Sequence, residues 1–212
     1  MSLGETVVTV IAGPGASLSA SVIKNLSAAL SVSRTDEIRA GQVVDLFCAL
    51  SPVEVYKIAP THIGDQPYDV IVQTAATRAK KVLVADMEST VIEQEMLDEL
   101  AEMIGVGEKV ALITRRAMNG EFDFVSALRE RVALLKGKPQ SLLDEAAKRI
   151  TFMPGAAELV STMKKQGALC WLVSGGFNCF VKPVAEKLGF DAFYANELII
   201  KDGIITGEVA AP

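Results

Sequence analysis

Residues 82–90 read VLVADMEST, an apolar run that ends abruptly in two carboxylates. The run Val82–Ala85 predicts a short strand buried in a sheet. Asp86 and Glu88 follow it at positions i and i+2, and in an extended chain such residues point the same way. One carboxylate could then attack a bound group as a nucleophile while the other transfers a proton. The same pair is also typical of a solvated strand end, so the spacing alone leaves both interpretations open.

A second apolar run supports a sheet around this segment. Residues 168–173 are continuously apolar, as in a parallel strand buried on both faces, and Ser174-Gly175-Gly176 follows them. The spacing of apolar residues predicts helices over 90–105, 108–118, 124–136, 154–166 and 179–188. Strands that alternate with helices indicate a parallel sheet, whose ligands lie beyond the carboxyl ends of its strands. Asp202-Gly203 predicts a hairpin turn after the last of these helices.

The first 80 residues predict a separate α+β module of the ferredoxin-like type. The expected strands and helices of this module cover residues 6–11, 18–30, 43–50, 52–59 and 68–74. Gly13-Pro14-Gly15 predicts a turn and not a phosphate-binding loop, because it lacks the spacing and the Lys of a P-loop. Ser17 is the expected cap of the first helix. The polar stretch 75–81 is the expected linker.

Composition excludes several classes of protein. The net charge is −5 and the pI about 5.1, which disfavours a non-specific nucleic-acid binder. The single histidine, His62, excludes a site built from several histidines, and a Ser-His-Asp triad would have to use it. Three cysteines without a CxxC pair predict neither a disulfide framework nor a cysteine zinc site. No apolar stretch suits a membrane span and Met1–Glu5 carries no basic signal region, so we expect a cytoplasmic protein.

Residues 85–101, ADMESTVIEQEMLDELA, resemble motif one of the phosphoserine phosphatase family in the haloacid dehalogenase-like (HAD) superfamily. Further segments agree with the family in order and spacing: AMNGEFDFVSALRERVALLKG, TFMPGAAELVSTMKKQGA, LVSGGF and EKLGFDAFYANELIIKDGIITG. Together they cover roughly residues 80–207. The first region resembles, more weakly, the ACT-like domains that precede this catalytic domain in many bacterial members.

The resemblance implies a fold and its boundaries. We expect an α/β protein whose HAD-type Rossmann-like parallel sheet carries a small helical cap and follows an α+β ferredoxin-like (ACT-like) domain. The expected boundaries are 1–74 for the ACT-like domain, 75–81 for the linker and 82–212 for the HAD phosphatase domain. The last of these divides into a core strand 82–86, a helical cap over about 91–150 and a core over 151–212.

The resemblance also implies a reaction, the hydrolysis of O-phospho-L-serine to L-serine and phosphate, which is the last step of serine biosynthesis. Asp86 matches the nucleophile that becomes an aspartyl-phosphate. Glu88, where the family usually has Asp, would protonate the leaving serine oxygen and then activate water. The Asp86 carboxylate and the main-chain carbonyl of Glu88 would bind Mg²⁺. Ser174 and Gly175 match the groups that hold the phosphoryl oxygens.

Four further positions match residues that recognise the serine part of the substrate. Glu95 matches the group that binds the ammonium, and Arg131 the group that pairs with the carboxylate. Met118 and Phe124 match apolar cap residues that close over the substrate and exclude water. The resemblance implies no nucleic-acid or membrane partner, and it leaves open a homodimer through the N-terminal domain.

The sequence departs from the family in two respects. Glu88 carries one methylene more than Asp, and a misplacement near 1 Å can cost about a hundredfold in rate, so we expect retuned turnover. Two parts of the family pattern, the motif-three Lys and the motif-four acidic pair, are not found in this sequence. Lys182 and Lys187 do not match the motif-three Lys, because they precede the hairpin. The chain could therefore be a fragment of a longer protein, or a truncated, inactive relative that acts as a ligand-binding or regulatory module. A HAD phosphatase for another small phosphate ester is a further alternative that stays open.

Overall fold

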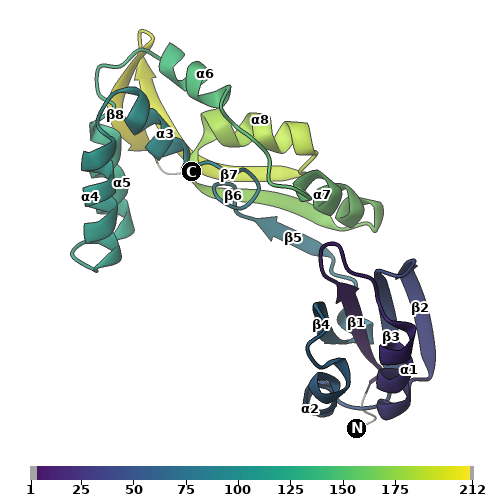
Figure 1. Ribbon diagram of the computed structural model, residues 1–212. Helices are drawn as coiled ribbons and strands as arrows, with labels where there is room; N and C mark the ends of the chain where they lie inside the picture. The colour runs from purple at the N-terminus through teal and green to yellow at the C-terminus, as the bar shows by residue number, and fades with distance from the viewer. Residues whose placement is uncertain (1–3, 211–212) are drawn as a thin grey trace. The chain divides into compact units, whose positions relative to one another are not determined.

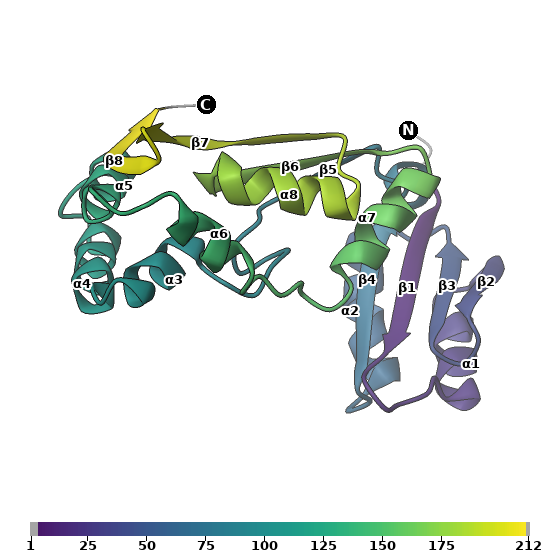
Figure 2. The ribbon, with the colours of Figure 1, turned by 90° about the horizontal axis from the view of Figure 1, so that it is seen from above.

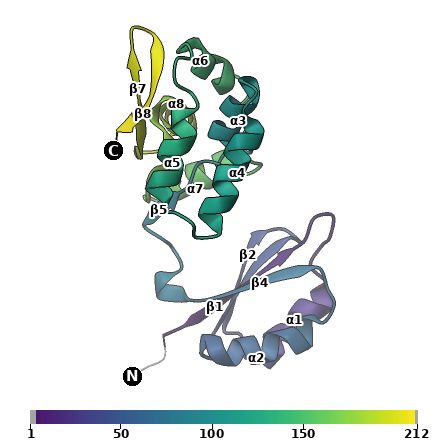
Figure 3. The same cartoon turned by 90° about the vertical axis from the view of Figure 1, so that its left-hand side faces the viewer.

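The computed structural model describes residues 4–210, which belong to two compact units, Met1–Lys80 and Lys81–Pro212 (Figure 1). The first unit is a four-stranded antiparallel sheet in the order β2-β3-β1-β4. Figure 3 shows its two helices together on one face of that sheet. The elements are β1 (Thr6–Ala12), α1 (Ala20–Ala29), β2 (Arg34–Arg39), β3 (Val43–Cys48), α2 (Pro52–Ile63) and β4 (Tyr68–Thr74).

The core of the first unit lies between the sheet and its helices. Val8, Val10 and Leu46 come from the strands and pack with Leu26 and Val55 from the helices, all of them fully buried. The element order βαββαβ is that of a ferredoxin-like fold, the type that the sequence predicted, although one of its strands was not expected.

Two details of the first unit differ from the sequence predictions, and a third agrees with them. Strand β2 was not predicted, because its sequence, RTDEIR, is mostly exposed and shows no apolar alternation. The prediction of Ser17 as a cap was wrong, because α1 has Ser19 at that position and its side chain makes no capping hydrogen bond. The expected turn at Gly13-Pro14-Gly15 is present, with the Ala16 N–H donating to the Gly13 carbonyl at 3.0 Å.

The second unit is built on the sheet β5-β6-β7-β8, in which β5, β6 and β7 are parallel and β8 is antiparallel to β7. Helices α7 and α8 pack against this sheet, and Figure 2 shows α8 lying along β6 and β7. The elements are β5 (Val82–Ala85), α3 (Met96–Met103), α4 (Gly107–Met118), α5 (Phe124–Ala133), α6 (Ser141–Ala147), α7 (Ala156–Lys165), β6 (Leu169–Phe177), α8 (Asn178–Leu188), β7 (Ala192–Lys201) and β8 (Ile204–Ala210). The α/β fold expected from the alternation of strands and helices is confirmed.

The two faces of this sheet differ in burial. Cys170 and Leu172 point to the helices and are fully buried, whereas their neighbours Leu169 and Trp171 are exposed on the other face. The hairpin turn at Asp202-Gly203 is confirmed, since both residues have the positive φ angles, 53° and 74°, that a type I′ turn requires.

The helix expected over 90–105 is shorter than predicted and begins only at Met96. Residues before it form a loop that bonds to the segment preceding α7: the Glu93 N–H donates to the Thr151 carbonyl at 3.0 Å, and the Met153 N–H donates to the Val91 carbonyl at 3.0 Å. Helix α5 also ends earlier than predicted, at Ala133. None of the helices within residues 4–210 has the length and apolarity needed to cross a membrane.

Candidate active site

The floor of the candidate site is formed where two parallel strands end. Ala85, the last residue of β5, pairs with Leu172 of β6, so Asp86 and Ser174 follow at the same edge of the sheet. Asp86 is exposed and its carboxylate accepts a 3.4 Å hydrogen bond from the Thr90 hydroxyl. Asp86 is thus exposed at the carboxyl end of a parallel strand, which is the edge of an α/β sheet where ligands bind.

Glu88 is partly buried beside Asp86 and connects three segments of the chain. Its carboxylate accepts a hydrogen bond from the Met96 backbone N–H at 2.8 Å, and the Ser174 hydroxyl lies 3.4 Å from its other oxygen. Burial, together with the negative charges of Glu95 and Asp86, raises the pKa of Glu88 to about 7. A carboxyl group with that pKa can both donate and accept a proton near neutral pH, which is the property of a general acid and base.

Ser174-Gly175-Gly176 leaves the regular pairing of β6 with β7, whose register is interrupted between Val173 and Phe177. The Gly176 N–H donates to the Ser174 hydroxyl at 2.9 Å. A Cβ atom at Gly176 would lie 2.7 Å from a Glu88 carboxylate oxygen, and one at Gly175 would lie 3.0 Å from the Phe124 ring. A side chain at Gly176 would therefore displace the Glu88 carboxylate, and one at Gly175 would push the Phe124 ring back by a few tenths of an ångström.

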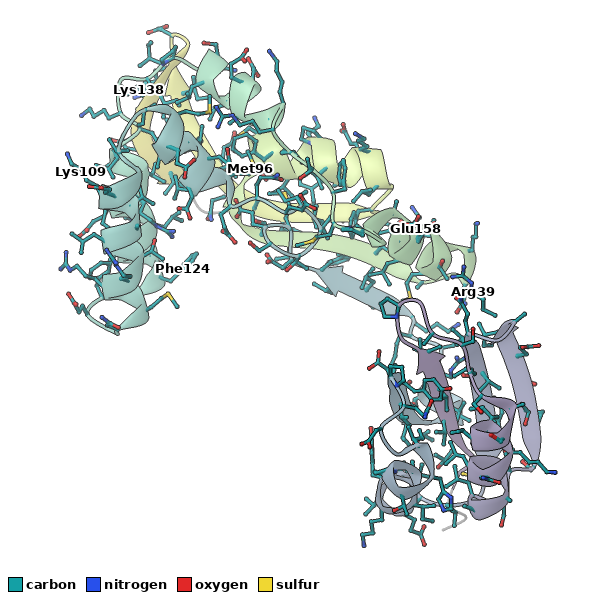
Figure 4. All side chains as sticks on the ribbon, in the orientation of Figure 1. Arg39, Met96, Lys109, Phe124, Lys138 and Glu158 are labelled. Atoms are coloured by element: carbon teal, nitrogen blue, oxygen red, sulfur yellow. The ribbon has the colours of Figure 1, made fainter. Side chains whose placement is uncertain are left out.

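Helices α3 and α5 supply the remaining charged groups. Glu95 immediately precedes α3, and its carboxylate accepts a 2.7 Å hydrogen bond from the Ser89 hydroxyl. Arg131 lies in the last turn of α5. Figure 4 labels Met96, where α3 begins, and Phe124, where α5 begins. Glu95 and Arg131 thus add a carboxylate and a guanidinium to the groups at the strand ends.

These groups surround one cavity of about 230 Å³. Its charged lining consists of Asp86, Glu88, Glu95, Asp98 and Arg131. Its apolar wall includes Leu97, Phe124, Leu128 and Phe177. The volume is below that of pockets for drug-sized ligands, so the cavity suits a small, polar molecule.

The structure brings most of the predicted site residues to this cavity. Asp86, Glu88, Glu95, Phe124, Arg131 and Gly175 line it directly. Ser174 is buried and contacts it through Glu88. Met118 does not line it: its side chain is 83% exposed and borders a neighbouring hollow of about 340 Å³.

Asp98 lines the cavity although the sequence analysis did not single it out. The signal was present, because Asp98 follows Glu95 by three residues and residues with this spacing share a helix face. It was missed because an acidic residue in the first turn of a helix is common for another reason, the favourable interaction with the helix dipole.

The cavity was also tested as a metal site. Within residues 4–210, no group of three or more His, Cys, Asp or Glu side chains could hold a metal ion. The Asp86 carboxylate and the Glu88 main-chain carbonyl are nevertheless oxygen donors, which hard ions such as Mg²⁺ prefer. Four carboxylates face a single guanidinium here, so an anionic ligand would need an added cation. The donor chemistry thus fits a divalent ion that keeps water or substrate oxygens as its other ligands.

Comparisons with known proteins agree with this geometry. A family model described as haloacid dehalogenase-like hydrolase matches residues 83–212. The phosphoserine phosphatase of Archaeoglobus fulgidus is 45% identical over 143 residues, which are 66% of this chain and 42% of that protein. The chain therefore spans about two fifths of the length of this curated relative.

Two solved structures are similar. One is a phospho-aspartyl intermediate analogue of phosphoserine phosphatase, 44% identical, with a TM-score of 0.59 over 62% of this chain and 63% of that one. The other is a probable phosphoserine phosphatase from Vibrio cholerae in unliganded form, 27% identical, with a TM-score of 0.70 over 99% of this chain and 64% of that one. Because the family model covers more than half of its residues, the chain belongs to the haloacid dehalogenase-like hydrolases.

Proposed function

We propose that the chain is a phosphoserine phosphatase, which hydrolyses O-phospho-L-serine to L-serine and phosphate through an aspartyl-phosphate at Asp86. The observation that carries this proposal is the single cavity lined by Asp86, Glu88, Glu95 and Arg131. It combines a nucleophile and a proton donor with one group for an ammonium and one for a carboxylate. The relative in Archaeoglobus fulgidus, a phosphoserine phosphatase, supports the same substrate.

The proposed reaction has two steps. A carboxylate oxygen of Asp86 attacks phosphorus, a new O–P bond forms, and the bond from phosphorus to the serine oxygen breaks while the Glu88 carboxyl gives that oxygen its proton. Water then attacks the phosphorus of the aspartyl-phosphate and gives a proton to the Glu88 carboxylate, which restores both side chains and releases phosphate. The raised pKa of Glu88, about 7, supports this exchange of one proton near neutral pH.

Residues around Asp86 would hold the phosphoryl group. Ser174 contributes its hydroxyl and Gly175 its backbone N–H, and their position at the end of β6, next to the end of β5, supports that role. The Asp86 carboxylate and the Glu88 main-chain carbonyl would hold Mg²⁺. The ion, when bound, neutralises charge on the phosphoryl oxygens.

The serine part would lie toward the helices. Glu95 would bind the ammonium, and Arg131 would pair with the carboxylate, for which a planar guanidinium is well suited. Phe124 would cover the cavity and exclude water, which its close approach to Gly175 supports. Met118 would join it only after the cap moves inward, because it now borders the neighbouring hollow.

The proposal extends to the domains of the chain, its cellular compartment and the place of the reaction in metabolism. The first unit would be an ACT-like domain, residues 75–81 the linker and the second unit the phosphatase domain with its cap. The proposed setting is the cytoplasm, in keeping with a sequence that has three cysteines and no CxxC pair. The reaction would be the last step of serine biosynthesis.

The test is phosphate release from O-phospho-L-serine by residues 1–212 in the presence of Mg²⁺, compared with the Asp86→Asn variant. We expect release by the parent chain and none above background by the variant, since an amide cannot form the phosphoryl intermediate. Equal release by the two proteins, or none by the parent, would contradict the proposal.

A further inference from the structure

Asp98 lines the same cavity as Glu95 and Arg131. It lies in the first turn of α3, three residues after Glu95, which is the N-cap residue of that helix, and both residues line the cavity. Arg131 comes from α5 and brings the opposite charge to the cavity. The cavity therefore presents two carboxylates from the start of α3 and one guanidinium from α5.

The Asp98 carboxylate is available for a ligand. Among residues 4–210 it makes no side-chain hydrogen bond and no ion pair, and its residue is exposed. Glu95 has one oxygen engaged by the Ser89 hydroxyl at 2.7 Å. The next residue, Glu99, differs from both, because it pairs with Arg149 at 3.1 Å and does not line the cavity.

Two carboxylates in this arrangement match a primary ammonium group. An ammonium has three N–H donors and no acceptor, so one carboxylate oxygen can satisfy only part of it. Glu95 keeps a second oxygen for such a donor, and Asp98 offers two more. A hydroxyl or carbonyl group at the same place would bring at most one donor and no charge, and would leave at least one carboxylate facing an uncharged atom.

We infer that Asp98 is a second ammonium-binding residue, which together with Glu95 makes the site select phosphate esters of amino acids over the corresponding hydroxy acids. This inference rests on the proposed function, because it assumes that the phosphoryl group lies at Asp86. Asp98 acts in specificity and has no part in transferring the phosphoryl group. Sites built to bind a charged or hydrogen-bonding group reject analogues that lack it far more strongly than apolar pockets reject a methylene.

The experiment compares two esters that differ only at the group in question. Phosphoserine carries the ammonium, and 3-phosphoglycerate carries a hydroxyl in its place. Dissociation constants are measured by calorimetry with Mg²⁺ present, in the Asp86→Asn background so that neither ester is turned over. The further variants are Asp98→Asn and, as a control, Glu102→Gln, which removes an exposed carboxylate of the same helix that does not line the cavity.

We expect Asp98→Asn to weaken phosphoserine binding about tenfold and to leave 3-phosphoglycerate binding unchanged or slightly tighter. Glu102→Gln should change neither. Equal weakening of both esters by Asp98→Asn, or no change in either, would overturn the role of Asp98 while leaving the proposed function intact. Failure of phosphoserine to be hydrolysed by the chain with both Asp86 and Asp98 present would instead contradict the proposed function as well.

Discussion

Glu88 accepts a hydrogen bond from the backbone N–H of Met96 at 2.8 Å, across the loop that separates β5 from α3. The bond by itself lowers the pKa of this carboxyl group, but burial outweighs it and raises the pKa to about 7. One methylene fewer would shorten the reach of the side chain, so this contact depends on the presence of Glu and not Asp. The chemistry proposed for the site therefore rests on the local setting of this one side chain.

The raised pKa makes folding stability depend on pH. The Glu88 carboxyl ionises near its ordinary value of 4.5 in the unfolded chain but only near pH 7 in the folded protein. Between these values the folded state binds more protons, so the free energy of unfolding falls as pH rises, by about 3 kcal/mol at most. Glu88→Gln does not titrate. We expect it to gain stability relative to the parent between pH 4.5 and 7, with a constant difference above that range.

Urea unfolding from pH 4.5 to 8.5, without metal and with EDTA present, measures this difference. Glu102→Gln controls for the removal of a carboxylate from the same part of the chain. A difference between Glu88→Gln and the parent that does not vary with pH would show that the Glu88 carboxyl ionises alike in both states.

The same substitution tests the proton transfer. Glu88→Gln keeps the shape of the side chain and its acceptor for the Met96 N–H, but it cannot donate an acidic proton. We expect kcat for phosphoserine hydrolysis to fall by roughly 10²- to 10⁴-fold with little change in KM. Steady-state phosphate release measures both constants. A raised KM with an unchanged kcat would instead assign Glu88 to substrate binding.

Gly176 lies too close to the Glu88 carboxylate for an added side chain to leave that group in place. A Cβ atom there would lie 2.7 Å from the Glu88 carboxylate, so Gly176→Ala must displace that group. We expect kcat/KM to fall more than about tenfold, since misplacing a reacting group by 1 Å can cost about a hundredfold.

Gly107→Ala is the matched control for this substitution. Gly107 has no positive φ angle, and the nearest atom to an added Cβ is an ordinary 3.5 Å away. It should leave kcat/KM unchanged. If Gly176→Ala proved equally harmless, the close packing between Gly176 and Glu88 would be wrong.

The two faces of the sheet in the second unit predict very different losses of stability when a side chain is truncated. Leu172 is 0% exposed beneath the helices, whereas Val84 is 59% exposed on the other face. Leu172→Ala should lower the free energy of unfolding by about 2–5 kcal/mol, and Val84→Ala by less than about 0.5 kcal/mol. Urea titration followed by circular dichroism measures both. Similar losses from the two substitutions would mean that the exposed face is covered in solution.

The strands and turns with strong local signals were predictable from the sequence. Strand β5 coincides with the apolar run Val82–Ala85, and Asp202-Gly203 forms the expected turn. Strand β2 was not predictable from periodicity, because an exposed edge strand has no apolar face to bury. The start of α3 was predicted too early. Val91 and Ile92 lie in the loop before the helix but are buried in the core, so the apolar pattern of the helix extends back to them in the sequence.

The site was predictable only in part. The two carboxylates after β5 followed from the spacing, and the other roles came from the resemblance to a family. The sequence could not show that Phe124 lines the cavity while Met118 borders only the neighbouring hollow, since both are apolar residues of the same helical insert. Nor could it show Asp98 beside Glu95, because surface helices carry many acidic residues and only the cavity distinguishes this one.

The central claim is that a side-chain oxygen of Asp86 is phosphorylated during turnover. The most direct measurement is to quench the chain with acid during hydrolysis of phosphoserine, reduce it with borohydride and map its peptides by mass spectrometry. An aspartyl-phosphate is reduced to homoserine, so the account predicts homoserine at position 86 and nowhere else. Turnover with unmodified Asp86, or homoserine at another aspartate, would contradict it.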